Sequence, residues 1–202
     1  MLGTFNLTDK DNRMIEIHNK RFEDVLPNIK FDAIITDPPY PDYMPEEYNY
    51  YDGLLDWCKN YDCKQIIFWS AKVDFPLDYT ARHIWDKKCG VGSMYEVIFE
   101  RNGGKAYKVY NYYLINSTVA ASFAKDEFYE HPSQKPLALM RKIILENTKE
   151  GDTVFDPFMG SGSTALACLK ENRNFIGCEV NEEYFKIVEH RVKKFNIAPT
   201  LF

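Results

Sequence analysis

The stretch Phe31-Asp32-Ala33-Ile34-Ile35-Thr36-Asp37-Pro38-Pro39-Tyr40 decides how the rest of this chain is interpreted. Its first six residues are mostly apolar and rich in isoleucine, which predicts a buried strand that ends at an acid. The two prolines lack backbone N–H groups and hold φ at about −65°, so the chain must leave the sheet in a stiff turn. Ligands of open α/β sheets bind at this edge. An acid and an aromatic ring there suit a planar group that bears an NH₂, whereas the alternative is an ordinary Pro-rich turn.

The composition indicates an ordinary globular protein. The chain has 202 residues, of which 45% are hydrophobic and 27% are charged,. No run reaches the ~18 apolar residues of a membrane span, and we expect no signal peptide and no membrane association. The five cysteines are scattered and odd in number, which favours reduced thiols and a cytoplasmic protein,. No Cys and His spacing matches a zinc site, so no metal is expected.

Apolar runs and segments with helical spacing alternate along the chain, which predicts an α/β fold with a largely parallel sheet. Strands are expected at 14–18, 33–36, 65–69, 95–99, 112–119, 153–155 and 174–178. Helices are expected at 21–26, 53–61, 137–147, 163–171 and 182–195, with a short helix or a helix-to-strand transition at 79–85. No repeat or linker is present. We therefore predict one domain over 1–202, with an elaboration at about 86–130.

A second candidate site is Asp156-Pro157-Phe158-Met159-Gly160-Ser161-Gly162-Ser163-Thr164, which follows a strand and opens a helix. Glycines at such a bend let the backbone approach a ligand, and a helix N-terminus offers free N–H groups. The stretch lacks the Gly-Lys-Ser/Thr ending of a P-loop, which argues against a nucleoside triphosphate. The next strand ends at Glu179, and an acid there suits the hydroxyls of a ribose. These features predict an adenosine-containing cofactor, with NAD left open because Ala165 satisfies the dinucleotide spacing.

Two further segments carry candidate residues. His131-Pro132-Ser133-Gln134-Lys135-Pro136 is a Pro-bracketed loop that opens a helix, although its His and Lys taken alone are more typical of the surface. The stretch 82–108 is basic and aromatic in a chain whose net charge is −5. It is a candidate nucleic-acid face, although charge alone favours a solvated hairpin. Its basic residues are Arg82, Lys87, Lys88, Arg101, Lys105 and Lys108.

The motifs 37–40, 131–136 and 156–164 with Glu179, in this order, resemble the S-adenosylmethionine-dependent DNA methyltransferases that act on amino groups. More narrowly, the chain resembles the circularly permuted, beta-type N6-adenine and N4-cytosine group, in which the catalytic motif comes first. The resemblance extends from about Met14 to Lys194. It implies a Rossmann-like methyltransferase fold, with a mostly parallel seven-stranded sheet flanked by helices. It also implies S-adenosyl-L-methionine as the cofactor.

The resemblance implies roles for the matched residues. In the catalytic motif of Asp37, Pro38, Pro39 and Tyr40, the acid and the first proline's carbonyl accept hydrogen bonds from the exocyclic amine of the target base. The tyrosine stacks on the base after it flips out of the duplex. The residues expected at the cofactor are Asn19, Asp37, Ser133, Lys135, Asp156, Phe158, Gly160, Ser161, Gly162 and Glu179. The residues expected at DNA are Lys87, Lys88, Arg101, Lys105 and Lys108,. No covalent enzyme intermediate is needed, because the amine is itself the nucleophile, and no metal is implied.

The resemblance also bears on specificity. Asp37 favours N6 of adenine in double-stranded DNA, since serine is common at this position in enzymes for N4 of cytosine. His18-Asn19 stands where the family often has Gly-Asp, and the Asn19 amide oxygen can still accept a hydrogen bond,. The short segment 86–130 predicts a short or loosely defined target site, a partner subunit or a homodimer. A prokaryotic or phage protein that acts in the cytoplasm is implied. The alternatives are an N4-cytosine enzyme, a non-catalytic nucleic-acid-binding subunit with the same fold, and a nicotinamide-dependent oxidoreductase.

Overall fold

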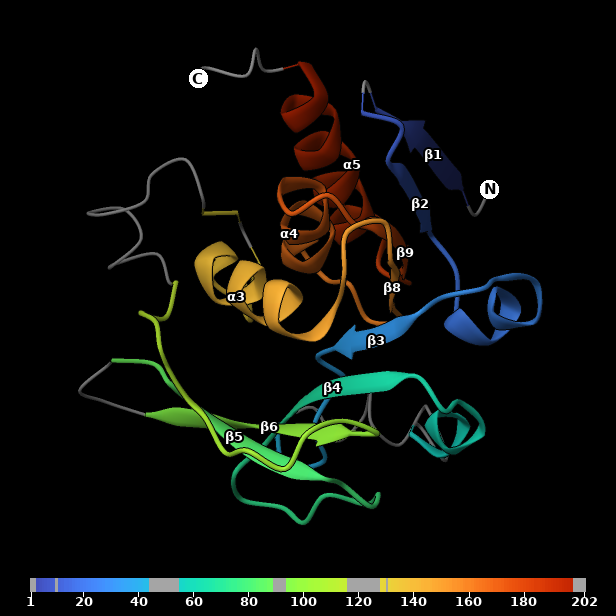
Figure 1. Ribbon diagram of the computed structural model, residues 1–202. Coiled ribbons are helices and arrows are strands. Elements are labelled where there is room, and N and C mark those ends of the chain that lie inside the picture. Colours follow the sequence, from blue (N-terminus) through green and yellow to red (C-terminus); the bar gives the residue numbers. More distant parts are fainter. Residues whose placement is uncertain are drawn as a thin grey trace. The chain divides into compact units, whose positions relative to one another are not determined.

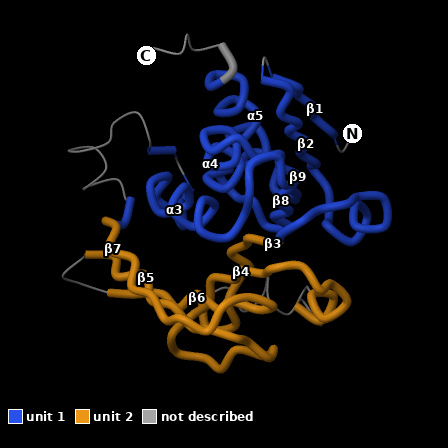
Figure 2. The backbone as a smooth tube through the Cα atoms, in the orientation of Figure 1, with its two compact units in different colours: residues 1–33, 114–202 blue, residues 34–113 orange. Residues whose placement is uncertain are grey.

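A computed structural model describes residues 3–9, 11–43, 55–88, 94–115, 128–129 and 131–197, with only the backbone for 196 and 197. The chain divides into two compact units, which Figure 2 colours separately. Unit 1 contains residues 1–33 and 114–202, and unit 2 contains residues 34–113. The single domain over 1–202 stays a prediction, and part of its elaboration at 86–130 lies outside the described residues.

Unit 1 contains four strands in the spatial order β1 (Thr4–Thr8), β2 (Met14–His18), β9 (Asn174–Cys178) and β8 (Thr153–Asp156). β1 runs antiparallel to β2, whereas β2, β9 and β8 run parallel to one another. Ile15, Ile17, Val154, Phe155 and Phe175 of these strands have no exposed surface. Continuous burial of branched and aromatic side chains is typical of parallel strands covered on both faces. β1 was not predicted, because its residues are only partly buried.

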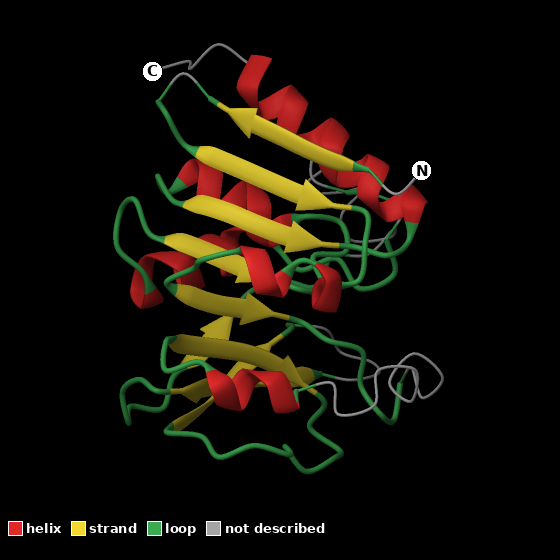
Figure 3. Cartoon of the chain, turned by 90° about the vertical axis from the view of Figure 1, so that its right-hand side faces the viewer, coloured by secondary structure: helices red, strands yellow, loops and turns green. Residues whose placement is uncertain are grey.

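Three helices belong to unit 1: α3 (Leu137–Asn147), α4 (Ser163–Lys170) and α5 (Glu182–Ile197) (Figure 1). α4 packs against α3, α5 and β9, and α5 also packs against β2 (Figure 3). α3 begins directly after Pro136, since a proline cannot donate into the first turn but is compatible with it,. α4 is buried over nearly its whole length, which its mostly small and apolar residues allow,.

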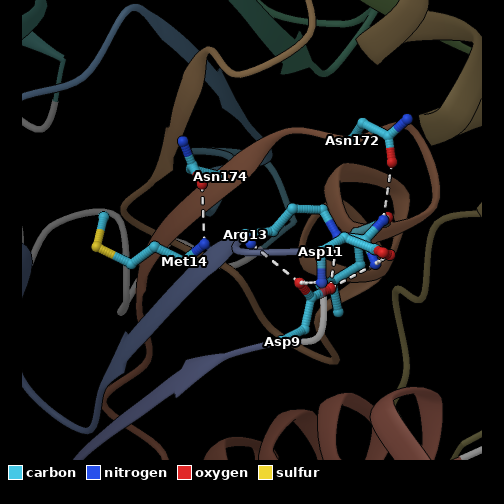
Figure 4. Close-up of polar contacts among 7 residues, drawn as sticks. Asp9, Asp11, Arg13, Met14, Asn172 and Asn174 are labelled. Atoms are coloured by element: carbon cyan, nitrogen blue, oxygen red, sulfur yellow. Dashed lines mark hydrogen bonds and ion pairs between the residues drawn. The ribbon is translucent and has the colours of Figure 1, made fainter.

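Arg13 ties the beginning of β2 to the end of α4 (Figure 4). Its guanidinium pairs with the carboxylates of Asp9 and Asp11. It also donates to the carbonyl oxygen of Leu169 at 2.6 Å and to Oδ1 of Asn172 at 2.9 Å. These contacts fix the start of β2. Asn19, which is one of the residues expected at the cofactor, directly follows the other end of this strand.

Unit 2 begins within β3 (Ala33–Thr36) and continues in the spatial order β4 (Lys64–Trp69), β6 (Tyr95–Arg101), β5 (Ala81–Asp86) and β7 (Val109–Asn111). β4 and β5 both run antiparallel to β6, and β7 runs parallel to β5. β3 is buried at all four positions, as its isoleucines predict. It therefore delivers Asp37 from a rigid strand.

Several expectations about local structure were wrong. The helix expected within 79–85 is absent, because residues 81–85 belong to strand β5, along which buried and exposed side chains alternate,. The helices expected at 21–26 and 53–61 are only 3₁₀ turns, η1 (Phe22–Asp24), η2 (Leu26–Asn28) and η3 (Asp56–Asn60). In the first of these segments Pro27 prevents an α-helix.

The strand expected at 112–119 is also misplaced, since β7 ends at Asn111 and residues 112–115 are irregular. Residues 116–119 lie outside the described residues. The described residues form nine strands rather than seven, because the edge strands β1 and β7 are added. The strand pairing is mixed rather than mostly parallel, since β6 runs antiparallel to both of its neighbours. Among the helices of the described ranges, none is long and apolar enough to cross a membrane.

Candidate active site

The motif that follows β3 holds an acid and an aromatic ring in contact. The Tyr40 hydroxyl donates a hydrogen bond to Oδ1 of Asp37 and lies 3.3 Å from Oε2 of Glu96. The Tyr40 ring meets Trp69 edge to face, with 5.7 Å between centroids. Burial, followed by the charges of Asp37 and Glu96, raises the pKa of Tyr40 well above its ordinary value. The phenol is therefore a hydrogen-bond donor at any physiological pH.

Glu96 reaches this motif from β6 together with Lys87, the residue that follows β5. Oε1 of Glu96 lies 2.7 Å from Nζ of Lys87, and the two side chains are only 12% and 9% exposed. Nζ of Lys87 also lies 5.3 Å from the ring centroid of Trp85. Lys87 shares the buried side of the strand with His83 and Trp85 because side chains alternate,. We expected Lys87 at DNA, but its charge has an internal partner.

The other residues expected at DNA differ in their surroundings. Arg101 donates from Nε to the carbonyl oxygen of Asp78 at 2.7 Å, so its guanidinium also has an internal role. Lys88 forms a surface ion pair with a neighbouring acid at 2.8 Å. Lys108 is half-buried and Lys105 is exposed, and no acid of the described residues pairs with Lys105. All five residues, Lys87, Lys88, Arg101, Lys105 and Lys108, stay predictions as DNA contacts.

In unit 1, Asp156 at the end of β8 braces the glycine-containing loop. Its Oδ1 accepts the backbone N–H of Phe158 at 3.1 Å, and its Oδ2 accepts the Thr164 hydroxyl at 2.7 Å. The side chain is almost fully buried. Asp156 was expected at the cofactor, which stays a prediction, and these two hydrogen bonds connect it to the motif at 156–164 itself. It therefore fixes the path from β8 into α4.

Both glycines of this loop adopt left-handed backbone conformations and lie against other side chains. Gly160 has φ 50° and Gly162 has φ 79°, a region that other residues enter at a cost,. A Cβ atom on Gly160 would lie 2.8 Å from Nε2 of His131. A Cβ atom on Gly162 would lie 2.6 Å from Cγ1 of Val188 in α5. The glycines are thus required by packing within unit 1 as well as by backbone conformation.

Glu179 directly follows β9 and contacts the same loop. Its Oε2 accepts the N–H of Gly160 at 3.1 Å, and its Oε1 accepts the N–H of Asn181 at 2.8 Å. Burial raises the pKa of Glu179 to about 7, against the opposing effect of these N–H donors,. Each carboxylate oxygen keeps a second lone pair, which suits one hydroxyl of a ribose. The donor and acceptor set at this strand end therefore fits an adenosine cofactor.

Asn19 directly follows β2, and its side chain is hydrogen-bonded to the backbone at Glu179 and Val180. Its side-chain NH₂ donates to the carbonyl oxygens of Glu179 at 2.8 Å and Val180 at 3.2 Å. Both amide hydrogens are thus used, which leaves Oδ1 as the acceptor that the side chain can offer a ligand. This positions Asn19 as expected for a group that accepts from an adenine amine, a role that stays a prediction.

The loop that starts at His131 is packed on the glycine loop. The His131 ring lies against Gly160 and meets Tyr184 of α5 with 4.4 Å between ring centroids. Burial, then the charges of Lys135 and Arg191, lower the pKa of His131 to about 4. His131 is therefore neutral at pH 7.

One further hydrogen bond connects this loop to α4, and another lies within the loop. The Ser163 hydroxyl donates to the carbonyl oxygen of Lys135 at 2.8 Å. The Ser133 N–H donates to the ring of His131 at 3.2 Å. The structure thus brings Ser133 and Lys135 together with the glycine loop and Glu179 in unit 1.

One residue of this region was missed in the sequence. Arg191 of α5 is buried, donates to the carbonyl oxygen of Ser161 at 2.5 Å, and places its guanidinium 4.4 Å from the ring centroid of Tyr129. Its helical spacing from the buried Val188 was the available signal, since residues three apart share a helix face. Arg191 therefore lies on the same buried face of α5 as Val188, where it binds the backbone of the glycine loop at Ser161.

A sequence profile of the DNA methylase family, N6_N4_Mtase, matches residues 61–190. The chain belongs to this family. Among similar proteins, the Type II methyltransferase M2.DpnII of Streptococcus pneumoniae is 35% identical over 132 residues, which cover 65% of this chain and 43% of that protein. The DNA adenine methyltransferase YhdJ of Escherichia coli K12 is 46% identical over 65 residues, which cover 32% of this chain and 22% of that protein. The chain thus spans less than half the length of these relatives.

Solved structures agree with the DNA methylase assignment. The crystal structure of the M1.HpyAVI–SAM complex has a TM-score of 0.63 and 27% identity, and the match covers 89% of this chain and 99% of that one. This likeness and the family match confirm the α/β methyltransferase fold and the resemblance to amino-group DNA methyltransferases. Over the part of the chain that the structure describes, no cluster of His, Cys, Asp or Glu could hold a metal ion.

Proposed function

We propose that this protein is a site-specific methyltransferase that transfers a methyl group from S-adenosyl-L-methionine to N6 of adenine in double-stranded DNA. The observation that carries the proposal is the contact of Tyr40 with Asp37 at the end of β3. Asp37 at the head of the motif and a relative named as an adenine methyltransferase favour adenine. N4 of cytosine is the second candidate, because the family profile includes both chemistries.

The motif after β3 is assigned to the target base. The Asp37 carboxylate and the Pro38 carbonyl accept the two N–H bonds of the exocyclic amine, which directs the nitrogen lone pair toward the methyl donor. The Tyr40 ring stacks on the flipped base, and its contact with Trp69 restricts its orientation,. Pro39 stiffens the backbone between the acid and the ring. Asp37 is also the nearest assigned base for the proton that the methylated nitrogen releases.

The residues of unit 1 are assigned to the cofactor. When bound, S-adenosyl-L-methionine supplies a methyl group activated by the positive charge on its sulfur. Glu179 accepts hydrogen bonds from the ribose hydroxyls, and Oδ1 of Asn19 accepts one from the adenine amine. Phe158, whose ring meets Phe22 at 5.3 Å between centroids, lies at the adenosine side. The loop residues expected at the methionyl side are Ser133, Lys135, Gly160, Ser161 and Gly162.

The biological setting is part of the same proposal. The described cysteines Cys58, Cys63, Cys168 and Cys178 are free thiols, which is compatible with a cytoplasmic protein,. Relatives named as Type II methyltransferases favour a role in restriction and modification of DNA. Because the recognition segment at 86–130 is short, a homodimer or a partner subunit would enlarge the DNA contact.

The test is methyl transfer from labelled S-adenosyl-L-methionine to unmethylated duplex DNA, followed by nucleoside analysis. Label is expected in N6-methyladenine. Asp37→Ala should abolish it, because the exocyclic amine of the target base loses its carboxylate acceptor. Asp42→Ala is the matched control, since Asp42 is an exposed acid beyond the motif and accepts a hydrogen bond from the Ser70 hydroxyl at 2.9 Å. Label confined to N4-methylcytosine would establish the second candidate, and label only in RNA would overturn the DNA substrate.

A further inference from the structure

Two carboxylates approach the same phenol in unit 2. The Tyr40 hydroxyl donates to Oδ1 of Asp37, and Oε2 of Glu96 lies 3.3 Å from the same oxygen. A hydroxyl has one proton and therefore makes one strong donor bond at a time. In the structure Asp37 takes that bond, and Glu96 is the second acceptor within reach.

The charge of Glu96 is balanced by Lys87. Their 2.7 Å ion pair is nearly covered by protein, and an ionised carboxylate in such a place is stable only with a partner,. Lys87 is held in turn by its place beside Trp85. The remaining oxygen, Oε2, is the one that faces Tyr40. Lys87 therefore holds the Glu96 carboxylate through Oε1 and keeps its second oxygen at the phenol.

We propose that Lys87 and Glu96 are a positioning pair for the catalytic motif, and that Glu96 is the alternative acceptor of the Tyr40 hydroxyl. This inference rests on the proposed function. When the amine of the target base donates to Asp37, the Tyr40 proton turns to Glu96, so the phenol is never left unpaired. The Tyr40 ring keeps its orientation while Asp37 changes partner. Lys87 thereby acts inside the protein rather than on a DNA phosphate.

The kinetic test separates this role from DNA contact. Glu96→Gln and Lys87→Met should each lower kcat about tenfold, as expected for the loss of one charge-assisted hydrogen bond, with the KM for DNA and its salt dependence unchanged. A Lys87→Met enzyme with unchanged kcat, a raised KM and a log–log salt slope reduced by about one would overturn the proposal, because that is the signature of a phosphate contact. Lys59→Met is the matched control. Lys59 pairs with Asp56 at 2.8 Å on the surface, and all three quantities should stay as in the wild type.

A second measurement needs no enzymatic activity. In an Asp37→Ala background the Tyr40 hydroxyl has only Glu96 of these two acceptors. There Tyr40→Phe and Glu96→Gln remove the same contact, so their shifts in melting temperature should be smaller in combination than their sum. Additive shifts would overturn the proposal. Lys87→Met with Glu96→Gln removes both charges together and should melt above Lys87→Met alone, which leaves a buried carboxylate unpaired. If the wild type transfers no methyl group, the proposed function fails while this comparison still decides the contact.

Discussion

His131 lies so close to Gly160 that a Cβ atom on the glycine would come within 2.8 Å of the imidazole Nε2. The two residues belong to different motifs, separated in the chain by α3 and β8. Their contact places the loop at 131–136 directly on the glycine loop. The neutral state of His131, whose pKa is lowered to about 4, is what this close packing requires.

Replacing Gly160 should therefore cost more than its backbone conformation alone explains. Gly160→Ala is expected to lower the free energy of unfolding by about 1–2 kcal/mol for the left-handed backbone, and further for the clash. Gly151→Ala is the matched control, since Gly151 has φ 83° and nothing within 4 Å of an added Cβ atom. Urea denaturation of both variants measures the difference. Equal losses of unfolding free energy in the two variants would contradict the packing role of His131. In a His131→Ala background, the loss caused by Gly160→Ala should come closer to the loss caused by Gly151→Ala.

Asn19→Asp should be destabilising although aspartate is the residue that the family often has there. The substitution removes the NH₂ that donates to the carbonyl oxygens of Glu179 and Val180, and it sets a carboxylate against them. We expect a loss of about 1–3 kcal/mol in the free energy of unfolding. Asn6→Asp in β1 makes the same chemical change at an exposed position and should have little effect. A stable Asn19→Asp protein would show that the amide donors are dispensable.

Glu179 should make the stability of the protein depend on pH between about 4.5 and 7. Its pKa is about 7 in the folded state and 4.5 in the reference state, so the folded state binds more protons in this interval. Stability should therefore fall as the pH rises from the lower value to the higher one and then level off. Because Gln does not titrate, the stability of the wild type relative to Glu179→Gln should decrease over the same interval. Denaturation of both proteins between pH 4.5 and 8 tests this, and a constant difference would contradict the raised pKa.

The same group should affect the affinity for adenosine. Ionised Glu179 is a better acceptor for ribose hydroxyls than its protonated form, so adenosine should bind more tightly at pH 8 than at pH 6. Adenosine itself does not titrate in this range, which makes it a suitable probe. Calorimetry with Glu179→Gln should show no increase in adenosine affinity between pH 6 and pH 8. An increase of equal size in that variant would show that another titrating group is responsible.

Arg101 and Lys105 should respond differently although both were expected at DNA. Arg101→Met removes hydrogen bonds to the carbonyl oxygen of Asp78 and to Oε1 of Gln65, so it should destabilise unit 2 by about 1–3 kcal/mol,. Its effect on the salt dependence of DNA binding should be small. Lys105→Met should leave stability unchanged and reduce the log–log salt slope by about one. If Arg101→Met instead reduced the salt slope and left the free energy of unfolding unchanged, Arg101 would be the phosphate contact.

The strands that carry the motifs were predictable from sequence because their signals are local. The isoleucines of β3 and the prolines after Asp37 specify a buried strand and a stiff turn without reference to the rest of the chain. The helix that begins at Ser163 follows from the glycines before it and the small apolar residues within it. A helix was expected within 79–85, since the alternation of residues 81–85 is recognisable as a strand only beside β6, with which they pair.

The amino-acid sequence alone was sufficient for the motifs, their order and the family, because each motif is a short run whose residue types reflect its chemistry. Only the tertiary structure showed which basic side chains pair with acids inside the protein and which lie at the surface. Lys87 and Lys88 are neighbours in the chain, but Lys87 continues the buried side of β5 toward Glu96, whereas Lys88 has φ 53° and lies at the surface,. Lys87 and Glu96 belong to different segments, and only the antiparallel pairing of β5 with β6 brings them within 2.7 Å. The motif after β3 could be recognised in the sequence, whereas the acceptor that supports Tyr40 depends on contacts that form when the strands pair.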